Sequence, residues 1–426
     1  MEPLTPALPT EVLTQIFALL SQHTLHACTL TSRAWYEAAV PFLYRSPSIT
    51  GKGFDSFVAA VCPSVNPRIR HNGLAELVRV LDMSKLVHNG RKSLTARLLG
   101  RMKYHLVAFI APQATFGINS LASLSHCEKL ETLDLSFVSE AIPYRSLFNS
   151  LCRLKHLHVL HLPRAFQADH DIDRGSQIAL RELERDAIDL SAEVFYRYPP
   201  ALRALSIHGG IDSVTLMYLV RAPTTLTSLS LSHCSRFSTE IVRQYLNRLK
   251  THTSLEHLQL GTGLFDHHSS FTAVLPPFDH LASLSIEAPL LLPYVHGFAL
   301  RSDSDFRPIA EGTMGSPWPR LHTITVLGPN NPPPTAHYYN LKPNEVYKAI
   351  DSGIFPALRK LRIDSKLGWS NTSNSITDLE DMTEDKQDLN DLLEALASED
   401  ADLDEHGEMG QTFVRPEEAG VFIFCS

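Results

Sequence analysis

One pattern of leucines recurs along most of this 426-residue chain. The pattern is L-x-x-L-x-L, with Ile, Val, Met or Phe in place of leucine in some copies. Its clearest copies begin at Leu130, Leu157, Leu202, Leu226, Leu255 and Leu281, and weaker copies begin at Val78, Leu106, Leu321 and Leu358. A short strand alternates its side chains between two faces, so we expect the second and third apolar residues of each copy to point into one shared interior.

The spacing of these copies predicts a stacked array, because a single copy cannot cover such an interior. From Leu130 onward the copies start 27, 45, 24, 29, 26, 40 and 37 residues apart. Most spacings lie near the roughly 20–29 residues of a leucine-rich repeat, and the longer ones indicate insertions. Helix-like segments lie between copies, the clearest at 238–249 with Ser238 as its predicted N-cap.

The predicted fold class is therefore α/β, with a leucine-rich-repeat-like solenoid over residues 76–368. Such a solenoid is a curved parallel sheet with helices, here with a Pro-rich loop at 327–343. An ordinary α/β domain with coincidental leucines is the alternative that stays open.

The residues that flank the inward leucines predict the character of the concave face. They are small, polar and mostly uncharged, and curved solenoids commonly offer extended binding surfaces, so we predict that this face binds a protein target. The predicted target-binding residues are Asp134, His161, Ser206, His208, Ser230, Ser232, His257, Gln259, Ser285 and Glu287. A solvated face that binds nothing, with contacts made by loops instead, remains the alternative for each of them.

The first forty-odd residues predict three short helices. Pro9 suits a helix entry, Thr10 is the predicted cap, and Glu11 meets the positive end of the helix dipole. One helical face then carries Val12, Ile16, Leu19 and Leu20. A second helix carries Leu25 and Cys28, and a third carries Trp35 and is predicted to stop at Pro41. Because the core of such a module is small, we expect part of its apolar surface to serve a partner.

These residues resemble the F-box over residues 5–48. The matching positions are Leu8-Pro9-x-Glu11-Val12, Ile16-Phe17-x-x-Leu20, Leu25, Cys28, Ser32-Arg33-x-Trp35 and Pro41-x-Leu43-Tyr44-Arg45. Thr31, where the family usually has Val, and His23-Thr24, where a Pro-x-Asp turn is common, depart from it. The segment 49–75 is predicted to be a linker or helical connection.

The resemblance implies that the module binds a Skp-type adaptor and, through it, the cullin and RING proteins of an SCF ubiquitin ligase. The positions that match the family's adaptor-facing or module-packing residues are Leu8, Pro9, Val12, Ile16, Phe17, Leu20, Leu25, Cys28 and Trp35. For Ile16 and Leu20, a place in the module's own core is an equally open interpretation.

The charge of the chain is divided unevenly. The formal net charge is -8, yet residues 1–376 hold 36 basic and 30 acidic residues, whereas residues 377–418 hold 2 and 16. Residues 369–418 are predicted to form an acidic, largely disordered tail. Within it, a short amphipathic helix is predicted to dock on the solenoid or on a partner, or to form only transiently; its apolar residues are Leu389, Leu392, Leu393 and Leu396. The apolar end at 419–426 is predicted to add a strand or anchor the chain.

Motifs of catalysis and metal binding are missing from the sequence. It has no P-loop, no H-E-x-x-H and no G-x-S-x-G. In the densest metal-capable cluster, Cys152 to His161, His158 and His161 fall on opposite faces of a predicted strand. The segment Asp169 to Gly175 imitates the start of an EF-hand loop but has Leu180 in place of the bidentate Glu. We therefore predict a non-catalytic protein without metal or cofactor.

The remaining features predict the compartment and the kind of partner. Six scattered cysteines, no signal peptide and no long apolar run predict a cytoplasmic or nuclear protein that does not bind membranes. The negative net charge argues against a nucleic-acid partner. Together with the resemblance, this predicts the substrate-recognition subunit of an SCF-type ligase. The alternative is a non-degradative F-box scaffold that acts outside a cullin complex.

Overall fold

The chain divides into two compact units, which comprise residues 1–188 with 196–202 and residues 189–195 with 203–426. The computed structural model describes residues 8–62, 73–86, 92–164, 166–167, 198–209, 216, 223–232, 239–261, 275–276, 278–295, 298–301, 305–308, 318–328, 341–369, 376–405 and 414–425. Over these ranges, no helix is both long and apolar enough to cross a membrane.

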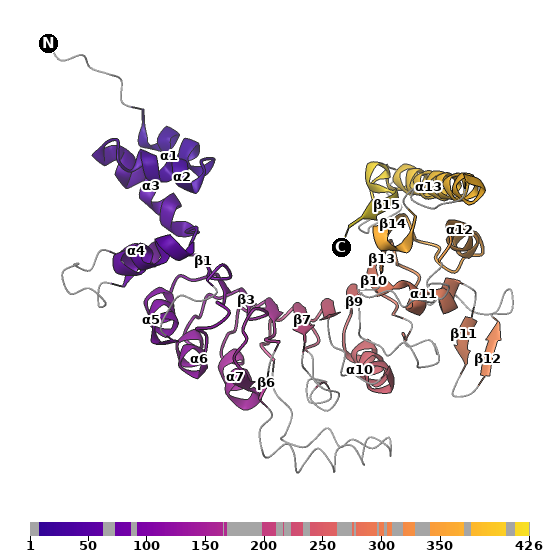
Figure 1. Cartoon of the computed structure of the whole chain (residues 1–426), viewed down its shortest axis with the longest axis horizontal. Coiled ribbons are helices and arrows are strands. Elements are labelled where there is room, and N and C mark those ends of the chain that lie inside the picture. The colour runs from indigo at the N-terminus through magenta and orange to yellow at the C-terminus, as the bar shows by residue number, and fades with distance from the viewer. Residues whose placement is uncertain are drawn as a thin grey trace. The chain divides into compact units, whose positions relative to one another are not determined.

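The first unit begins with helices and continues with alternating strands and helices (Figure 1). Its opening elements are α1 (Thr10–Ala18), α2 (Gln22–Cys28), α3 (Arg33–Arg45), α4 (Gly51–Val61) and the 3-10 turn η2 (Leu74–Leu77). The strands are β1 (Val80–Asp82), β2 (Ala108–Ile110), β3 (Thr132–Asp134) and β5 (Val159–His161), with a small side sheet of β4 (Ile142–Pro143) and β6 (Phe166–Gln167). The helices α5 (Lys92–Met102), α6 (Ile118–Leu124) and α7 (Tyr144–Leu151) pack side by side along one side of the strands.

The second unit repeats this arrangement with longer strands. These are β7 (Ala204–His208), β8 (Ser228–Ser232), β9 (His257–Leu260), β10 (Ser283–Glu287), β13 (Thr323–Leu327), β14 (Lys360–Asp364) and β15 (Gly420–Phe424). Its helices are α10 (Thr239–His252), α11 (Ala288–Val295), α12 (Pro343–Asp351) and α13 (Ile376–Glu405), with the short turns η4 (Ser365–Leu367) and η5 (Pro416–Glu418). A separate hairpin joins β11 (Phe298–Arg301) to β12 (Asp305–Pro308).

Each of the ten predicted copies contributes one strand, and within each unit neighbouring strands pair in parallel in chain order. The register stacks equivalent leucines, for example Leu205 on Leu229 and Leu229 on Leu258. These leucines are buried, as are the third apolar residues, such as Leu135 and Leu231. The prediction of an N-terminal helical module followed by stacked strand-and-helix repeats is therefore confirmed. The predicted cap Ser238 and the EF-hand-like segment lie outside the described residues.

The third helix is longer than predicted, because Pro41 lies inside α3 instead of ending it. A proline within a helix lacks one N–H donor and crowds the preceding turn. The turn beyond it has compensating contacts: Phe42 and Leu43 pack on the module's core, and Tyr44 stacks on Phe57 of α4 with ring centroids 6.5 Å apart. The Arg45 carbonyl then accepts a hydrogen bond from the Arg79 backbone N–H at 2.9 Å, just before β1.

The prediction of a largely disordered acidic tail is wrong for residues 376–405, which form α13. The physical reason is a docked apolar stripe: Leu389, Leu393 and Ala397 are fully buried, and Leu392 and Leu396 are half-buried at their margin. The helix packs on α12 and on β15, beside which Figure 1 shows it. Of the three outcomes open from the sequence, docking on the array is the one that the structure shows.

The contacts of α13 also cover the last strand of the sheet. The Val421 backbone N–H of β15 donates to Asn390 Oδ1 of α13 at 2.9 Å. On an edge strand without such a partner, this N–H would be exposed and unpaired. Deeper in the interface, Asp400 accepts two hydrogen bonds from the Arg359 guanidinium, from Nε at 2.7 Å and from Nη2 at 3.1 Å. Both side chains are largely buried. The apolar end predicted at 419–426 thus adds strand β15 and is held by α13.

We expect Asp400→Ala to loosen α13, because it leaves the buried guanidinium of Arg359 without a carboxylate. Breaking one partner of a buried ion pair typically costs about 3–5 kcal/mol. Hydrogen–deuterium exchange should accelerate at the amides of α13 and β15 and stay unchanged in α1–α3. The control is Glu37→Ala, which removes the exposed Arg33–Glu37 pair and should cost under about 1 kcal/mol. Unchanged exchange in Asp400→Ala would contradict this account of the tail.

Candidate functional site

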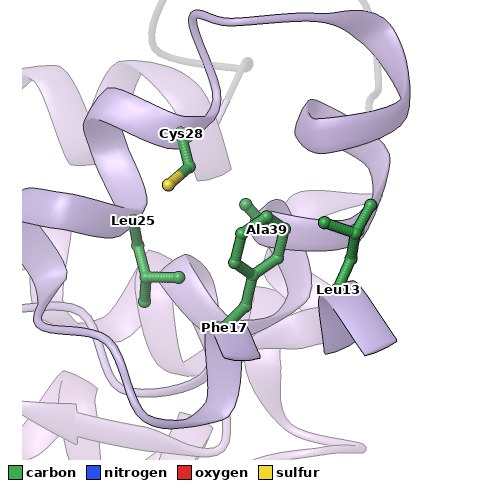
Figure 2. Close-up of a cluster of buried hydrophobic side chains, with 6 residues drawn as sticks. Leu13, Phe17, Leu25, Cys28 and Ala39 are labelled. Carbon is green, nitrogen blue, oxygen red and sulfur yellow. The ribbon is translucent and has the colours of Figure 1, made fainter. Parts of the chain in front are cut away.

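The first three helices enclose a small core of their own. Leu13, Phe17, Leu25, Cys28 and Ala39 are buried and point toward one another (Figure 2). The indole ring of Trp35 meets the Phe17 ring edge-on, with centroids 5.5 Å apart. Hydroxyl caps start two of the helices: Ser21 accepts from the Thr24 backbone N–H and Ser32 from that of Trp35, both at 3.3 Å. The first helix has no side-chain cap, since Pro9 is its N-cap residue and Thr10 lies in its first turn.

The helix α1 carries a second apolar stripe that this core does not use. Val12, Ile16 and Leu19 follow one another at the spacing of one helical face, about 100° around the helix from Leu13 and Phe17. Ile16 is 41% exposed and Leu19 is 89% exposed. Leu8, which precedes the helix, is also half exposed. We call Leu8, Val12, Ile16 and Leu19 the α1 stripe; a group of exposed apolar side chains of this kind marks an interaction surface.

The predicted adaptor-binding residues therefore fall into two groups. Leu8, Pro9, Val12 and Ile16 are exposed, as contact with a partner requires. Of the two roles that the resemblance left open, Phe17, Leu25 and Cys28 take the module-packing one, because they fill the core and support the module from inside. Leu20 and Trp35 lie between these extremes, half-buried against the same core.

The module is attached to the first repeat through α3, η2 and α4. The Arg45–Arg79 hydrogen bond lies at this connection, beside a cavity of 510 Å³ lined by Pro41, Arg45, Leu77, Arg79, Val80 and Val107. Burial, reinforced by the nearby Tyr36 hydroxyl, raises the pKa of Tyr44, so this residue is a neutral phenol at the connection. The α1 stripe is consequently carried on helices that pack directly onto the repeats of the first unit.

The open face of the second unit carries a row of polar side chains. The register places Ser206 beside Ser230, Ser230 beside Gln259, and Gln259 beside Ser285. Ser230 Oγ donates to Gln259 Oε1 at 3.2 Å. We call these four residues, with Thr325 next to Ser285, the polar row. Four predicted target-binding residues are thus brought together, and His257 is exposed on the same strand as Gln259.

Other predicted face residues have structural roles. Asp134 Oδ1 accepts a hydrogen bond from the Ser136 backbone N–H at 2.8 Å, which closes the turn after β3 in the first unit. His161 lies beside Asp134 in the register. In the second unit, His208 Nδ1 hydrogen-bonds Ser232 Oγ. Ser232 and Glu287 are buried, so their predicted place on an open surface is wrong.

The sequence prediction did not assign to a binding set three residues that lie at least partly at the surface, one at the end of α1 and two on β14. Leu19 was assigned to the stripe of α1 but not to the binding set, although its spacing from Val12 and Ile16 signals one face. At the other end of the chain, Lys360 and Arg362 alternate with the buried Leu361 and Ile363 of β14. The weak copy at Leu358 already contained this alternation.

Metal-binding groups and reactive cysteines are the other candidates for a site among the described side chains. No group of three or more His, Cys, Asp or Glu side chains able to hold a metal lies in the parts of the chain that the structure describes. Burial raises the pKa of the Cys127 thiol to about 12, so this cysteine is an unreactive core residue. What the described residues offer is surfaces, the α1 stripe and the polar row.

Comparison with known proteins identifies the N-terminal module. Residues 5–50 match the F-box-like family model. The chain is 26% identical over 360 residues to a Saccharomyces cerevisiae protein named F-box protein YDR306C, and 21% identical over 355 residues to a Schizosaccharomyces pombe protein named Protein pof5. These alignments cover 84% and 83% of the chain, and 66% and 88% of the respective relatives. The chain thus spans just under two thirds of the budding-yeast relative's length. The predicted resemblance is confirmed, and the three-helix module at the N-terminus is an F-box-like domain.

Proposed function

We propose that this chain is the substrate-recognition subunit of an SCF-type ubiquitin ligase. The F-box-like domain implies binding of a Skp-type adaptor, and the observation that carries the proposal is the α1 stripe on that domain. In the proposed complex the adaptor connects the chain to cullin and RING subunits, while the repeats hold a protein target.

The energetics of the α1 stripe support a docking role. Fully burying a Leu, Ile or Val side chain contributes about 1.5–3 kcal/mol, and the stripe leaves four such side chains at least 38% exposed. Keeping them in water has no benefit for the fold, because Leu13 and Phe17 already supply the core contacts of α1. A partner surface that covers the stripe therefore gains a large apolar contribution from a few residues.

The repeats support the second half of the proposal. The polar row extends over β7 to β13, and stacked repeats present such rows as one continuous surface. Serine, threonine and glutamine side chains offer hydrogen-bond donors and acceptors at low cost in charge desolvation. We propose that this surface binds the target. The chain itself contributes positioning and no catalysis, and it acts in the cytoplasm or nucleus.

A scaffold role outside a cullin complex is the second candidate. The same α1 stripe supports it, because adaptor binding alone does not require a cullin. The two functions differ in whether the adaptor-bound chain also retains a cullin.

We expect Ile16→Gln with Leu19→Gln to weaken adaptor binding by at least about tenfold, since burying one Ile or Leu side chain contributes about 1.5–3 kcal/mol and tenfold corresponds to about 1.4 kcal/mol. The domain should still fold, because both side chains lie outside its core. Pull-down of the adaptor with purified full-length chain, alongside circular dichroism, measures the two properties. Ile118→Gln, another exposed isoleucine outside the domain, is the matched control. Undiminished adaptor binding in the double variant would refute the role of the α1 stripe.

We also expect a cullin to be retained on immobilised chain only when the adaptor is present. The measurement is a three-component pull-down with wild type and with the Ile16→Gln/Leu19→Gln variant, which should lose both partners. Adaptor retained by wild type without cullin would favour the scaffold role over the ligase role.

A further inference from the structure

On the last two strands of the second unit, the side chains of the open face are basic and aromatic, unlike those of the polar row. On β14 the alternation leaves Lys360 and Arg362 on the open face, because Leu361 and Ile363 point inside. On β15 it leaves Phe422, which is 40% exposed, and Phe424 on the same face. We call these four side chains the basic end.

The four side chains form two cation–π contacts. Lys360 Nζ lies 5.2 Å from the ring centroid of Phe422, and Arg362 Cζ lies 5.2 Å from that of Phe424. A cation–π contact uses the charge of an arginine without occupying its N–H donors, which can then bind a carboxylate. The contacts also restrict two otherwise flexible cations, which lowers the entropy lost when they bind an anion.

The positive charge of the basic end is not neutralised by an ion pair within the described residues. Neither Lys360 nor Arg362 belongs to a pair of the kind that joins Arg33 to Glu37, Arg359 to Asp400 and Arg415 to Glu417. The nearest acidic residue along β14, Asp364, is fully buried. Its two carboxylate oxygens accept backbone N–H bonds, from Gly328 at 3.2 Å and from Lys366 at 3.0 Å. It therefore closes a turn and does not pair with either cation across the face.

The basic end continues the polar row. Thr325 of β13 lies beside Arg362 of β14, and Arg362 lies beside Phe422 of β15. Neighbouring strands are about 4.8 Å apart, so a bound chain that crosses the strands passes from hydroxyl groups to cations within a few residues. The surface thus offers hydrogen bonds along its length and two cations at one end.

We propose that the basic end binds a cluster of aspartate or glutamate side chains in the target, whose flanking chain lies along the polar row. This inference rests on the proposed function, since it names the chemistry of the segment that the repeats hold. Carboxylates have the opposite charge to the two cations and fit the planar fork of a guanidinium, and charge-assisted hydrogen bonds are stronger than neutral ones. A nucleic acid fits less well: it gains affinity from many phosphate contacts, whereas the face offers two cations in a chain of net charge -8.

The test measures binding of a short fluorescein-labelled peptide of consecutive glutamates followed by alternating serine and alanine. Fluorescence anisotropy with the full-length chain should show binding that falls as salt rises from about 50 to about 300 mM, because ionic contacts at a surface are screened. Lys360→Ala with Arg362→Ala should weaken binding at least about fivefold. Arg203→Ala with Lys348→Ala, which removes two exposed cations elsewhere in the same unit, is the matched control and should not weaken it.

Three outcomes would overturn the inference. The first is equal binding by wild type and the Lys360→Ala/Arg362→Ala variant. The second is equal binding of a peptide with glutamines in place of the glutamates. The third is tighter binding of a phosphoserine peptide or of a single-stranded oligonucleotide than of the glutamate peptide, which would assign the basic end to phosphate. Adaptor pull-down with the same variants should be unchanged, so a failure here is distinguishable from a failure of the proposed function.

Discussion

Within each unit, parallel pairing that stacks leucine on leucine is the constraint on which the other features depend. In the second unit this column runs from Leu205 through Leu229 and Leu258 to Leu284. A slip by one residue would turn every leucine to solvent, so the register is strongly specified. The residues between the leucines must then lie on the open face. The polar row and the basic end are consequences of this alternation, and their positions are as well determined as the core itself.

The strand that begins the first unit, β1, and the strand that ends the second unit, β15, each have an outer edge without a neighbouring strand among the described residues. Just before β1, the Arg45 carbonyl at the end of α3 accepts a hydrogen bond from the Arg79 backbone N–H. At β15, α13 covers the edge through Asn390 and Val421. The F-box-like domain and the acidic helix look like appendages in the sequence. In the structure, α3 of the domain packs on η2, just before β1, and α13 packs on β15, as a terminal cap of a repeat protein does.

The sequence predicted the strands better than it predicted which side of a helix is buried. All ten copies were found, since two inward residues per copy form a period that a single sequence reveals. On α1, however, two apolar stripes lie one residue apart, and only α2 and α3 determine that Phe17 is inside and Ile16 outside. Pro41 was predicted to end the third helix because a proline destabilises a helix locally. The contacts that stabilise the turn beyond Pro41 come from residues distant in the sequence, so the local pattern does not reveal them. The tail was predicted to be largely disordered because its average composition is acidic and polar. Its helix is stabilised by three buried positions, Leu389, Leu393 and Ala397, which change that average little.

The distribution of charge in the second unit favours one orientation for an anionic chain bound on its open face. The helix α13 packs against β15, where the carboxylate of the exposed Glu394 lies beside Gly420, and its other exposed positions include Glu384, Asp388 and Asp391. An anionic chain that extended past β15 toward α13 would meet like charges, while one that extended toward β13 would meet only hydroxyl and amide groups at the positions of the polar row. At physiological salt, charges interact over about 8 Å, a distance of fewer than two strands. A segment with carboxylates at Lys360 and Arg362 is therefore favoured in one orientation, with the rest of its chain running back along the row toward β8.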